Sequence, residues 1–182
     1  MHNHLFKLFS VVSMSQESYI DSITEELIKF GDFTLTSGKK SNYYVDIKEA
    51  CTDPETLSAI CDDLAGNTVY GTVAGMELGA VPLIVGVALK TGKKYIIVRK
   101  GERTHGTGSR LVGKVVPGTR IDIIEDVVTT GNSILKTAEI IRDAGAIVDH
   151  AVCVVDRESG GPELLRENGI KLVSVAKISE LL

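Results

Sequence analysis

The chain has 182 residues, 43% of them hydrophobic and 24% charged, a composition typical of a globular domain with a sizeable core. Its net charge of −4 weighs against nucleic-acid binding, and it means that any site for a polyanion must gather positive charge locally. No apolar run reaches the ~20 residues that a membrane helix needs. Three separated cysteines form no CxxC pair or zinc pattern, as expected of reduced thiols in the cytoplasm.

The first elements follow a short leading peptide. Residues 1–14 lack the cleavage site of a signal peptide, and we expect either a flexible extension or an upstream start codon there, before a single domain at 15–182. Apolar side chains at helical spacing predict a helix over residues 16–30, which Gly31 ends. A polar, turn-rich stretch then rises into a β-like run at residues 43–47.

Strands and helices alternate through the rest of the chain. A helix begins near Thr52 or Asp53, either of which suits its N-cap, and ends at Gly66. Strands are then expected at 68–74, 95–99, 111–116, 120–125, 148–155 and 171–175, and helices at 81–89, 133–144 and 162–168. This alternation predicts an α/β fold with a mainly parallel central sheet flanked by helices. Ligands of such sheets bind at the carboxyl ends of the strands.

Residues 121–133 (IDIIEDVVTTGNS) carry the strongest functional signal. A buried strand ends in two acids, and a small, polar loop leads directly into a helix. The amides and the positive dipole end of a helix N-terminus suit a phosphate. Acids beside a phosphate are explained if they accept hydrogen bonds from ribose hydroxyls and stabilise a ribose that becomes cationic. The candidate residues are Glu125, Asp126, Val127, Val128, Thr129, Thr130, Gly131, Asn132 and Ser133.

This segment resembles the motif of type I phosphoribosyltransferases that binds phosphoribosyl pyrophosphate (PRPP): an apolar strand, two acids, two apolar residues and a Thr/Gly-rich loop. A generic strand-to-helix turn with incidental acids is the alternative interpretation. The chain has neither a Walker loop nor a GxGxxG fingerprint.

The glycine-rich segment at 98–113 (VRKGERTHGTGSRLVG) resembles the flexible catalytic loop of orotate phosphoribosyltransferases. The matching positions are Arg99, Lys100, Arg103 and His105, and the family usually has lysine where Arg103 stands. Such a loop is suited to closing over a pyrophosphate and neutralising its charge. The resemblance implies catalytic roles for Arg103, His105 and Asp126. Without the PRPP motif, a solvated basic hairpin would be the better interpretation.

Two further segments point to the base. FTLTSGKKSNYYVDI (33–47) resembles the family's N-terminal hood, where Tyr43 and Tyr44 would pack against a planar base, although either is also an ordinary strand aromatic. VVDRESGG (154–161) resembles the segment that carries an arginine to the orotate carboxylate, here Arg157, with Thr129 beside it. A structural Asp156–Arg157 pair on the surface is the alternative.

The chain departs from the family's pattern around the pyrophosphate. The turn at 74–83 occupies the position of the family's pyrophosphate loop, but Met76-Glu77 stands where bacterial members often have Tyr-Lys. Thr36 stands where the family often has lysine. Glu77 cannot neutralise pyrophosphate, so main-chain amides and a metal ion are expected to contribute more.

The resemblance implies a type I phosphoribosyltransferase fold with a small hood near residues 15–50. It also implies transfer of phosphoribosyl from PRPP to orotate in pyrimidine biosynthesis, with Mg²⁺ carried by PRPP rather than held by direct protein ligands. A homodimer that shares the 99–110 loop between subunits is implied too. Two alternatives stay open: a purine or uracil phosphoribosyltransferase, and a non-catalytic sensor of PRPP or nucleotides with the same fold.

Overall fold

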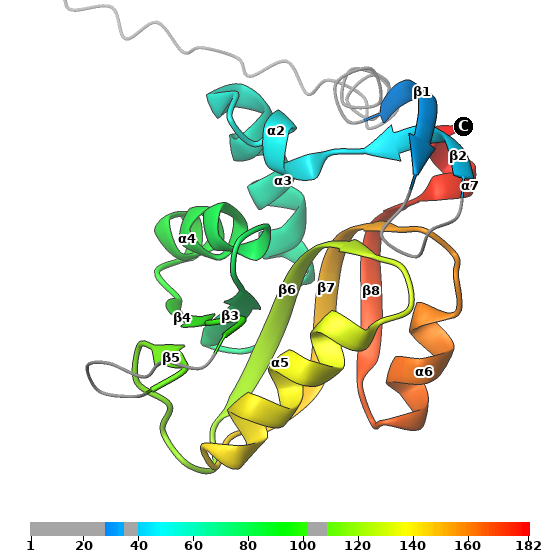
Figure 1. Ribbon diagram of the computed structural model, residues 1–182. Coiled ribbons are helices and arrows are strands. Elements are labelled where there is room, and N and C mark those ends of the chain that lie inside the picture. The colour runs from blue at the N-terminus through cyan, green and yellow to red at the C-terminus, as the bar shows by residue number, and fades with distance from the viewer. Residues whose placement is uncertain (1–27, 35–39, 102–108) are drawn as a thin grey trace, which may run out of the picture.

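A six-stranded sheet forms the centre of the molecule (Figure 1). The computed structural model describes residues 28–34, 40–101 and 109–182. The strand order is β5-β4-β3-β6-β7-β8, and every neighbouring pair is parallel except β4–β5. The strands are β3 (Thr72–Met76), β4 (Lys94–Val98), β5 (Leu111–Val112), β6 (Arg120–Val128), β7 (Ile147–Asp156) and β8 (Lys171–Lys177). The prediction of an α/β fold with a mainly parallel sheet is therefore confirmed.

Helices cover both faces of this sheet. On one face, α3 (Pro54–Asn67) and α4 (Ala80–Thr91) bury Ile60, Leu64 and Leu83 against β3, β6 and β7. On the other face, α5 (Asn132–Asp143) and α6 (Gly161–Glu167) contribute Ile134, Ile141 and Leu165 to a second apolar cluster. Because both faces are buried, the central strands are apolar throughout rather than alternating. No helix in the described part of the chain is long and apolar enough to cross a membrane.

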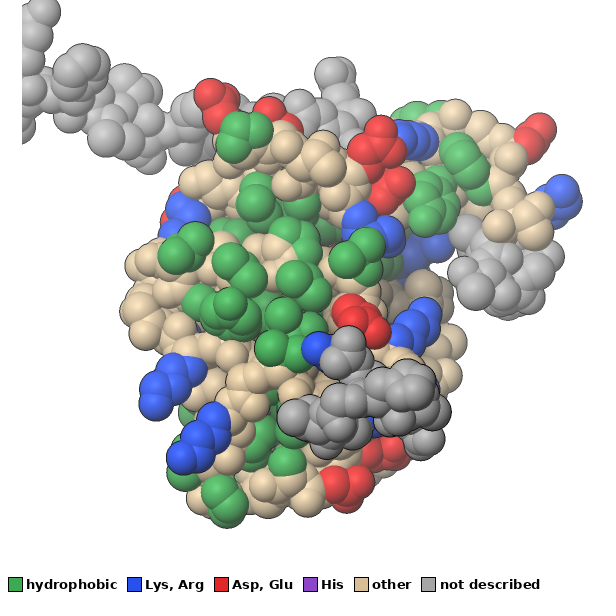
Figure 2. Space-filling model, turned by 60° about the vertical axis from the view of Figure 1, so that its left-hand side comes forward, with side chains coloured by type: hydrophobic (Ala, Val, Ile, Leu, Met, Phe, Trp, Pro, Cys, Tyr) green, Lys and Arg blue, Asp and Glu red, His purple; other side chains and the backbone are tan. Residues whose placement is uncertain are grey.

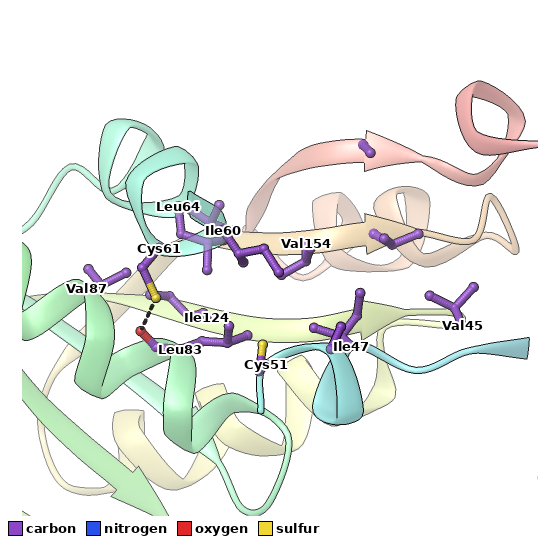
Figure 3. Close-up of a cluster of buried hydrophobic side chains, with 14 of the residues drawn as sticks. Val45, Ile47, Cys51, Ile60, Cys61, Leu64, Leu83, Val87, Ile124 and Val154 are labelled. Carbon is purple, nitrogen blue, oxygen red and sulfur yellow. Dashed lines mark hydrogen bonds between the residues drawn. The ribbon is translucent and has the colours of Figure 1, made fainter. Parts of the chain in front are cut away.

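The helices α3 and α4 meet closely at a sulfur atom (Figure 3). The Cys61 thiol of α3 contacts the Leu83 carbonyl oxygen at 3.7 Å. A Cβ atom on Gly86 of α4 would lie only 2.3 Å from the Cys61 sulfur, so glycine is required at that position. This contact sets the position of α4 along α3. The helix α4 begins directly after the turn at 77–79.

A small hood packs against the core near the C-terminus (Figure 1). Its strands β1 (Ile28–Thr34) and β2 (Lys40–Val45) are antiparallel, and the short helix α2 (Ile47–Ala50) follows. The short helix α7 (Ile178–Leu181) ends the chain and shares their apolar cluster. Neither short helix was predicted.

The predicted helix over 16–30 is wrong at its C-terminal end. Residues 28–30 lie in β1 and pair with β2, Ile28 opposite Val45 and Phe30 opposite Tyr43. Pairing with a distant strand overrides local helical spacing here. The rest of that expected helix and the expected N-terminal extension lie outside the described residues, so the domain boundaries stay predictions.

Other differences concern boundaries. The strand before the candidate phosphate loop runs to Val128 rather than Glu125, so the loop itself is only Thr129–Gly131. The first core strand begins at Thr72 rather than at residue 68. The strand expected at 111–116 contains two residues. Asp53, not Thr52, is the N-cap of α3, with Pro54 in the first turn.

The amino end of β6 is held by a buried polar cluster. Asp122 is fully buried, and its carboxylate accepts hydrogen bonds from the amides of Val69 (3.0 Å) and Tyr70 (2.7 Å). Its other oxygen lies 2.9 Å from Nδ1 of His150 on β7. The Tyr70 hydroxyl donates to Asp149 at 2.8 Å. We call these four side chains the base clamp, because they tie β6, β7 and the chain entering β3 together at the end opposite the carboxyl termini of the parallel strands.

Candidate functional site

The carboxyl end of β6 and the start of α5 enclose a cavity of about 180 Å³. Its lining combines carboxylate, hydroxyl and main-chain groups from one continuous segment. The residues are Glu125, Val127, Val128, Thr129, Thr130, Gly131, Asn132, Ser133 and Ile134. The structure thus brings nearly all of the predicted phosphate segment around one small hollow, with Asp126 immediately beside it.

The N-terminus of α5 is open toward this cavity. Its N-cap residue, Gly131, offers no side chain to the helix amides, and the first turn contains no acid. Gly131 has a φ of +82°, and an added Cβ would lie 3.1 Å from Leu165 Cγ and 3.2 Å from the Gly161 carbonyl oxygen. Glycine therefore satisfies both the left-handed backbone and the close approach of α6. The open helix end provides oriented amides and a positive dipole end for an anion.

Glu125 is buried at the inner wall of the cavity. Its carboxyl group accepts a hydrogen bond from the Ser133 hydroxyl at 2.6 Å, so Ser133 links the acid to the helix start. Burial raises the pKa of Glu125 to about 8, and the neighbouring Asp126 carboxylate adds to the rise. Both effects favour the protonated form of Glu125 more than in a solvated glutamate. Its neutral form reduces the repulsion that the acid pair would otherwise exert on an incoming phosphate.

Asp126 lies toward the other side, against the turn at 77–79. One carboxylate oxygen accepts the Val127 amide at 2.8 Å, and the other lies 3.4 Å from Nζ of Lys48 on α2. A Cβ atom on Gly79 would be 2.1 Å from that second oxygen, so only glycine fits beside the carboxylate. Asp126 and Tyr44 keep the pKa of Lys48 above its usual value, although partial burial acts in the opposite direction. The two acids thus face different surroundings although they are adjacent in sequence.

The predicted base-binding residues separate into two groups: Thr129, Arg157 and Tyr43 lie together, and Tyr44 lies apart from them. The Arg157 amide donates to the Val128 carbonyl at 2.8 Å, which sets Arg157 next to Thr129. Its guanidinium lies 5.0 Å from the Tyr43 ring centroid, a cation–π contact. Tyr44 instead stacks obliquely on Phe33, with centroids 5.5 Å apart. Successive side chains of a strand point to opposite faces, so the two tyrosines do not line one surface.

The described ends of the expected catalytic loop lie beside the 77–79 turn. The Arg99 amide donates to the Arg110 carbonyl at 2.8 Å, and this bond closes the neck of the loop. The Lys100 amide donates to a Glu77 carboxylate oxygen, also at 2.8 Å. Arg103, His105 and Thr36 lie outside the described residues, so their expected roles stay predictions.

Comparison with known proteins settles the family. No model of a protein family matches the chain. The orotate phosphoribosyltransferase of Thermoplasma acidophilum, however, is 60% identical over 154 residues, covering 85% of this chain and 90% of that protein. The chain belongs to the orotate phosphoribosyltransferase family.

Solved structures of family members agree with this assignment. The crystal structure of orotate phosphoribosyltransferase from Aeropyrum pernix matches with a TM-score of 0.81 at 33% identity, covering 90% of this chain and 96% of that one. The orotate phosphoribosyltransferase of Mycobacterium tuberculosis in complex with PRPP matches with a TM-score of 0.74 at 29% identity, covering 89% and 96% of the two chains. The type I phosphoribosyltransferase fold expected from the sequence is confirmed.

Several groups at this family site were not found from the sequence. Lys48 lies 78 residues before Asp126 in a segment without a motif, and no periodicity in the sequence points to their contact. Gly79 and Gly161 are each required by close packing, and a Cβ on Gly161 would lie 2.5 Å from Val128 Cγ1. Their glycine identity was the only available signal.

The described residues contain no group of three or more His, Cys, Asp or Glu side chains that could hold a metal ion. The acid pair offers oxygen donors of the kind that Mg²⁺ prefers, but two carboxylates alone leave most of its coordination to other ligands. The expectation that Mg²⁺ arrives with PRPP stays a prediction. A larger hollow of about 610 Å³ lies elsewhere, between α4, β4 and the segment after β5.

Proposed function

We propose that the protein is an orotate phosphoribosyltransferase, which transfers the 5-phosphoribosyl group of PRPP to orotate and releases orotidine 5′-monophosphate and pyrophosphate. The observation that carries this proposal is the 180 Å³ cavity, which an open helix N-terminus and Glu125 line, with Asp126 beside it and Arg157 bonded through its amide to Val128 of its wall. The family members named above support the same substrates, since one was crystallised with PRPP.

In this proposal the sugar phosphate occupies the cavity. The amides and hydroxyls of residues 129–133 bind the 5-phosphate, and Glu125 and Asp126 accept hydrogen bonds from the ribose hydroxyls. The apolar side chains of Val127 and Val128 shape the wall rather than donate. As the C1–O bond breaks ahead of attack, the ribose becomes cationic, and the Asp126 carboxylate, with Glu125 once it has lost its proton, stabilises that charge.

Arg157 selects the base. A guanidinium can grip a carboxylate through two parallel hydrogen bonds, and orotate carries a carboxylate that uracil and the purines lack. Thr129 lies beside Arg157, and Tyr43 supports the guanidinium from the hood. We propose that Thr129, Arg157 and Tyr43 orient orotate, so that its nitrogen attacks C1 from the face opposite the leaving group. Tyr44, on the other face of β2, contacts Phe33 and supports the hood, and its expected contact with the base stays a prediction.

The leaving pyrophosphate lies toward the 77–79 turn and the 99–110 loop. Arg99, Lys100, Arg103 and His105 supply the positive charge that closes over it, while loop closure excludes water. Mg²⁺ bound to the pyrophosphate and ribose oxygens of PRPP would neutralise part of the leaving charge. Positioning and fixed charges thus provide most of the rate enhancement.

We further propose a homodimer built on the α4–β4–β5 side. Figure 2 shows hydrophobic side chains gathered on this face of the molecule. Exposed apolar residues include Leu89, Tyr95, Val112 and Val116, and the 610 Å³ hollow lies among them. Such a patch is typical of a protein–protein interface. The same edge carries the neck of the 99–110 loop, so a second copy docked there is within reach of it. Mixing Arg103→Ala and Asp126→Asn chains tests the sharing, because active hybrid sites form only if the loop serves the partner.

A cytoplasmic location fits this metabolic role and the state of the thiols. Cys51, Cys61 and Cys153 are free and buried. Burial raises the pKa of Cys51 to about 12 and that of Cys61 to about 11, so neither is reactive at neutral pH.

The decisive experiment follows the loss of orotate absorbance after addition of PRPP and Mg²⁺. We expect turnover by the wild-type protein and a loss of at least about a hundredfold in kcat/KM for Arg157→Ala, because a bidentate charged contact disappears. Arg166→Ala, which changes an exposed arginine on α6, is the matched control. Turnover of uracil or hypoxanthine without turnover of orotate would contradict the base assignment. Binding of PRPP with no turnover of any base would favour the sensor.

A further inference from the structure

The 77–79 turn contributes no positive side chain to the site. Its one charged residue, Glu77, is acidic, and its carboxylate is already bonded to the Lys100 amide. Met76 before it is buried, and Leu78 is apolar. Asp126, packed against Gly79, adds another negative charge at the same place. A pyrophosphate bound here therefore depends on cations from the 99–110 loop, as proposed above, and from any further element that reaches this turn.

Lys48 brings a cation to this place from the hood. Its Nζ lies 3.4 Å from Asp126 Oδ2, the same oxygen that excludes any side chain at position 79. The ammonium group and the 77–79 turn therefore meet at one carboxylate oxygen. Among the ion pairs of the described residues, only that of Lys48 involves Glu125 or Asp126, and it joins Lys48 to Asp126.

The backbone of Lys48 is held in a short helix with buried neighbours, whereas its side chain is partly exposed. On either side of it in α2, Ile47 is fully buried and Ala50 is 7% exposed, and the Asp46 carboxylate caps the helix through the Glu49 amide at 3.3 Å. The Lys48 side chain itself is 46% exposed. A long ion pair with an exposed lysine is weak, so a phosphate oxygen of a bound ligand can displace Asp126 from the ammonium group.

We propose that Lys48 is a substrate-binding residue that contacts the pyrophosphate of PRPP. This inference rests on the function proposed above and assigns to this chain's own hood the cation that the 77–79 turn lacks. When PRPP binds, the Lys48 ammonium exchanges Asp126 for a pyrophosphate oxygen. Asp126 keeps its bond to the Val127 amide, and its second oxygen becomes available to a ribose hydroxyl.

The exchange accounts for a long pair, 3.4 Å, between a lysine that is 46% exposed and an aspartate that is 13% exposed. A tightly bonded, buried pair would hold Asp126 away from the ribose and would resist separation. A loose pair instead keeps the ammonium near the site before the substrate arrives, and it balances the charge of Asp126 until then.

The test compares two ligands that differ in pyrophosphate. Isothermal titration measures the Kd of Mg²⁺–pyrophosphate and of orotidine 5′-monophosphate for the wild type and for Lys48→Met, Lys48→Arg and Lys90→Met. Lys90 is the matched control because it forms an ion pair with Asp62 on the outer side of α3 and α4. Thermal unfolding of each variant checks that it is folded.

We expect Lys48→Met to weaken pyrophosphate about tenfold or more, with less than a threefold change for orotidine 5′-monophosphate. The KM for PRPP should rise accordingly, while kcat changes less. Lys48→Arg should restore most of the affinity, and Lys90→Met should match the wild type. Equal weakening of both ligands, or no weakening of pyrophosphate, overturns the inference. If wild-type protein does not turn over orotate and PRPP, the proposed function fails instead, so the two failures are distinguishable.

Discussion

The N-termini of α3 and α5 are built in opposite ways. At α3, the Asp53 carboxylate accepts the Thr56 amide at 2.8 Å, Pro54 occupies the first turn, and Glu55 adds a second acid. At α5, the cap is Gly131, the first turn has no acid, and the nearest carboxyl, Glu125, is held by Ser133 at the end of the preceding strand. The first helix end is satisfied by its own chain, whereas the second is left open beside a cavity.

This difference separates stability from binding. A closed end contributes to the folding free energy whether or not a ligand is present. An open end gives up that contribution and keeps its amides and dipole for an anion from solution. The contrast leads to four predictions, which either convert one end into the other or weaken one end alone.

The largest expected effect concerns the buried acid at the open end. The folded-state pKa of Glu125, about 8, lies above its unfolded value, so this group favours folding at low pH, and that contribution is lost as the pH rises through about 8. Glu125→Gln removes the titration and keeps an acceptor for Ser133. Between pH 5 and pH 8.5, the wild type should lose unfolding free energy relative to the variant, on the order of a few kcal/mol. Urea unfolding of the ligand-free proteins at both pH values measures this, with Glu139→Gln as control. Parallel pH profiles for wild type and Glu125→Gln would contradict it.

Converting the open end into a closed one should exclude the phosphate. Asn132→Asp places a carboxylate at the first position of α5, where it repels the 5-phosphate. We expect the KM for PRPP to rise on the order of a hundredfold, while the helix gains about 0.3–1 kcal/mol from the dipole. Asn132→Ala removes the same side-chain bond to Thr130 without adding charge. If both variants raise KM equally, charge at the open end is not the cause.

Distorting the open end should cost stability as well as affinity. Gly131→Ala puts a Cβ into a left-handed residue and against Leu165 and Gly161. We expect about 2 kcal/mol less unfolding free energy, together with a higher KM for PRPP. Gly118→Ala, at a φ of +79° with open space around it, is the control for backbone strain alone. A stability loss no larger than that of the control would show that the loop relaxes away from α6.

Opening the closed end should have the smallest effect, confined to folding. Asp53→Ala removes the cap of α3 and should lower the unfolding free energy by about 1 kcal/mol. Asp53→Asn keeps an acceptor and should retain most of it. Both variants should keep the wild-type kcat and KM, because no residue of α3 lines the 180 Å³ cavity. A change in the KM for PRPP in either variant would contradict this prediction, because it would show that the start of α3 affects binding at the start of α5.

Sequence reasoning recovers what short-range patterns encode. The core strands and the helices α3 to α6 follow from apolar periodicity, caps and glycine stops, and so does the open helix start after two acids. It fails where distant pairing decides the conformation. Residues 28–30 have helical spacing but pair with β2, and β6 continues through Val128 because β7 offers it partners as far as Asp156.

For the candidate site, sequence motifs identified many of the residues, and the fold showed which of them contact one another. The contact between Arg157 and Tyr43 joins residues from β2 and the end of β7, and that between Lys48 and Asp126 joins the hood to the core. Neither distance follows from spacing along the chain. The opposite orientations of Tyr43 and Tyr44 do follow from the alternation of a strand, once residues 40–45 are known to be one.

The base clamp bears on how freely the catalytic end of the molecule can vary. Asp122 and His150 secure β6 and β7 at one end, and the other end of the same two strands carries the acid pair and Arg157. Residues selected for chemistry often destabilise a fold, and a protein tolerates them only while other parts keep it above its stability threshold. Variants with a weakened clamp should therefore accept fewer second substitutions around the cavity, which makes Asp122 a position that limits the engineering of new base specificities.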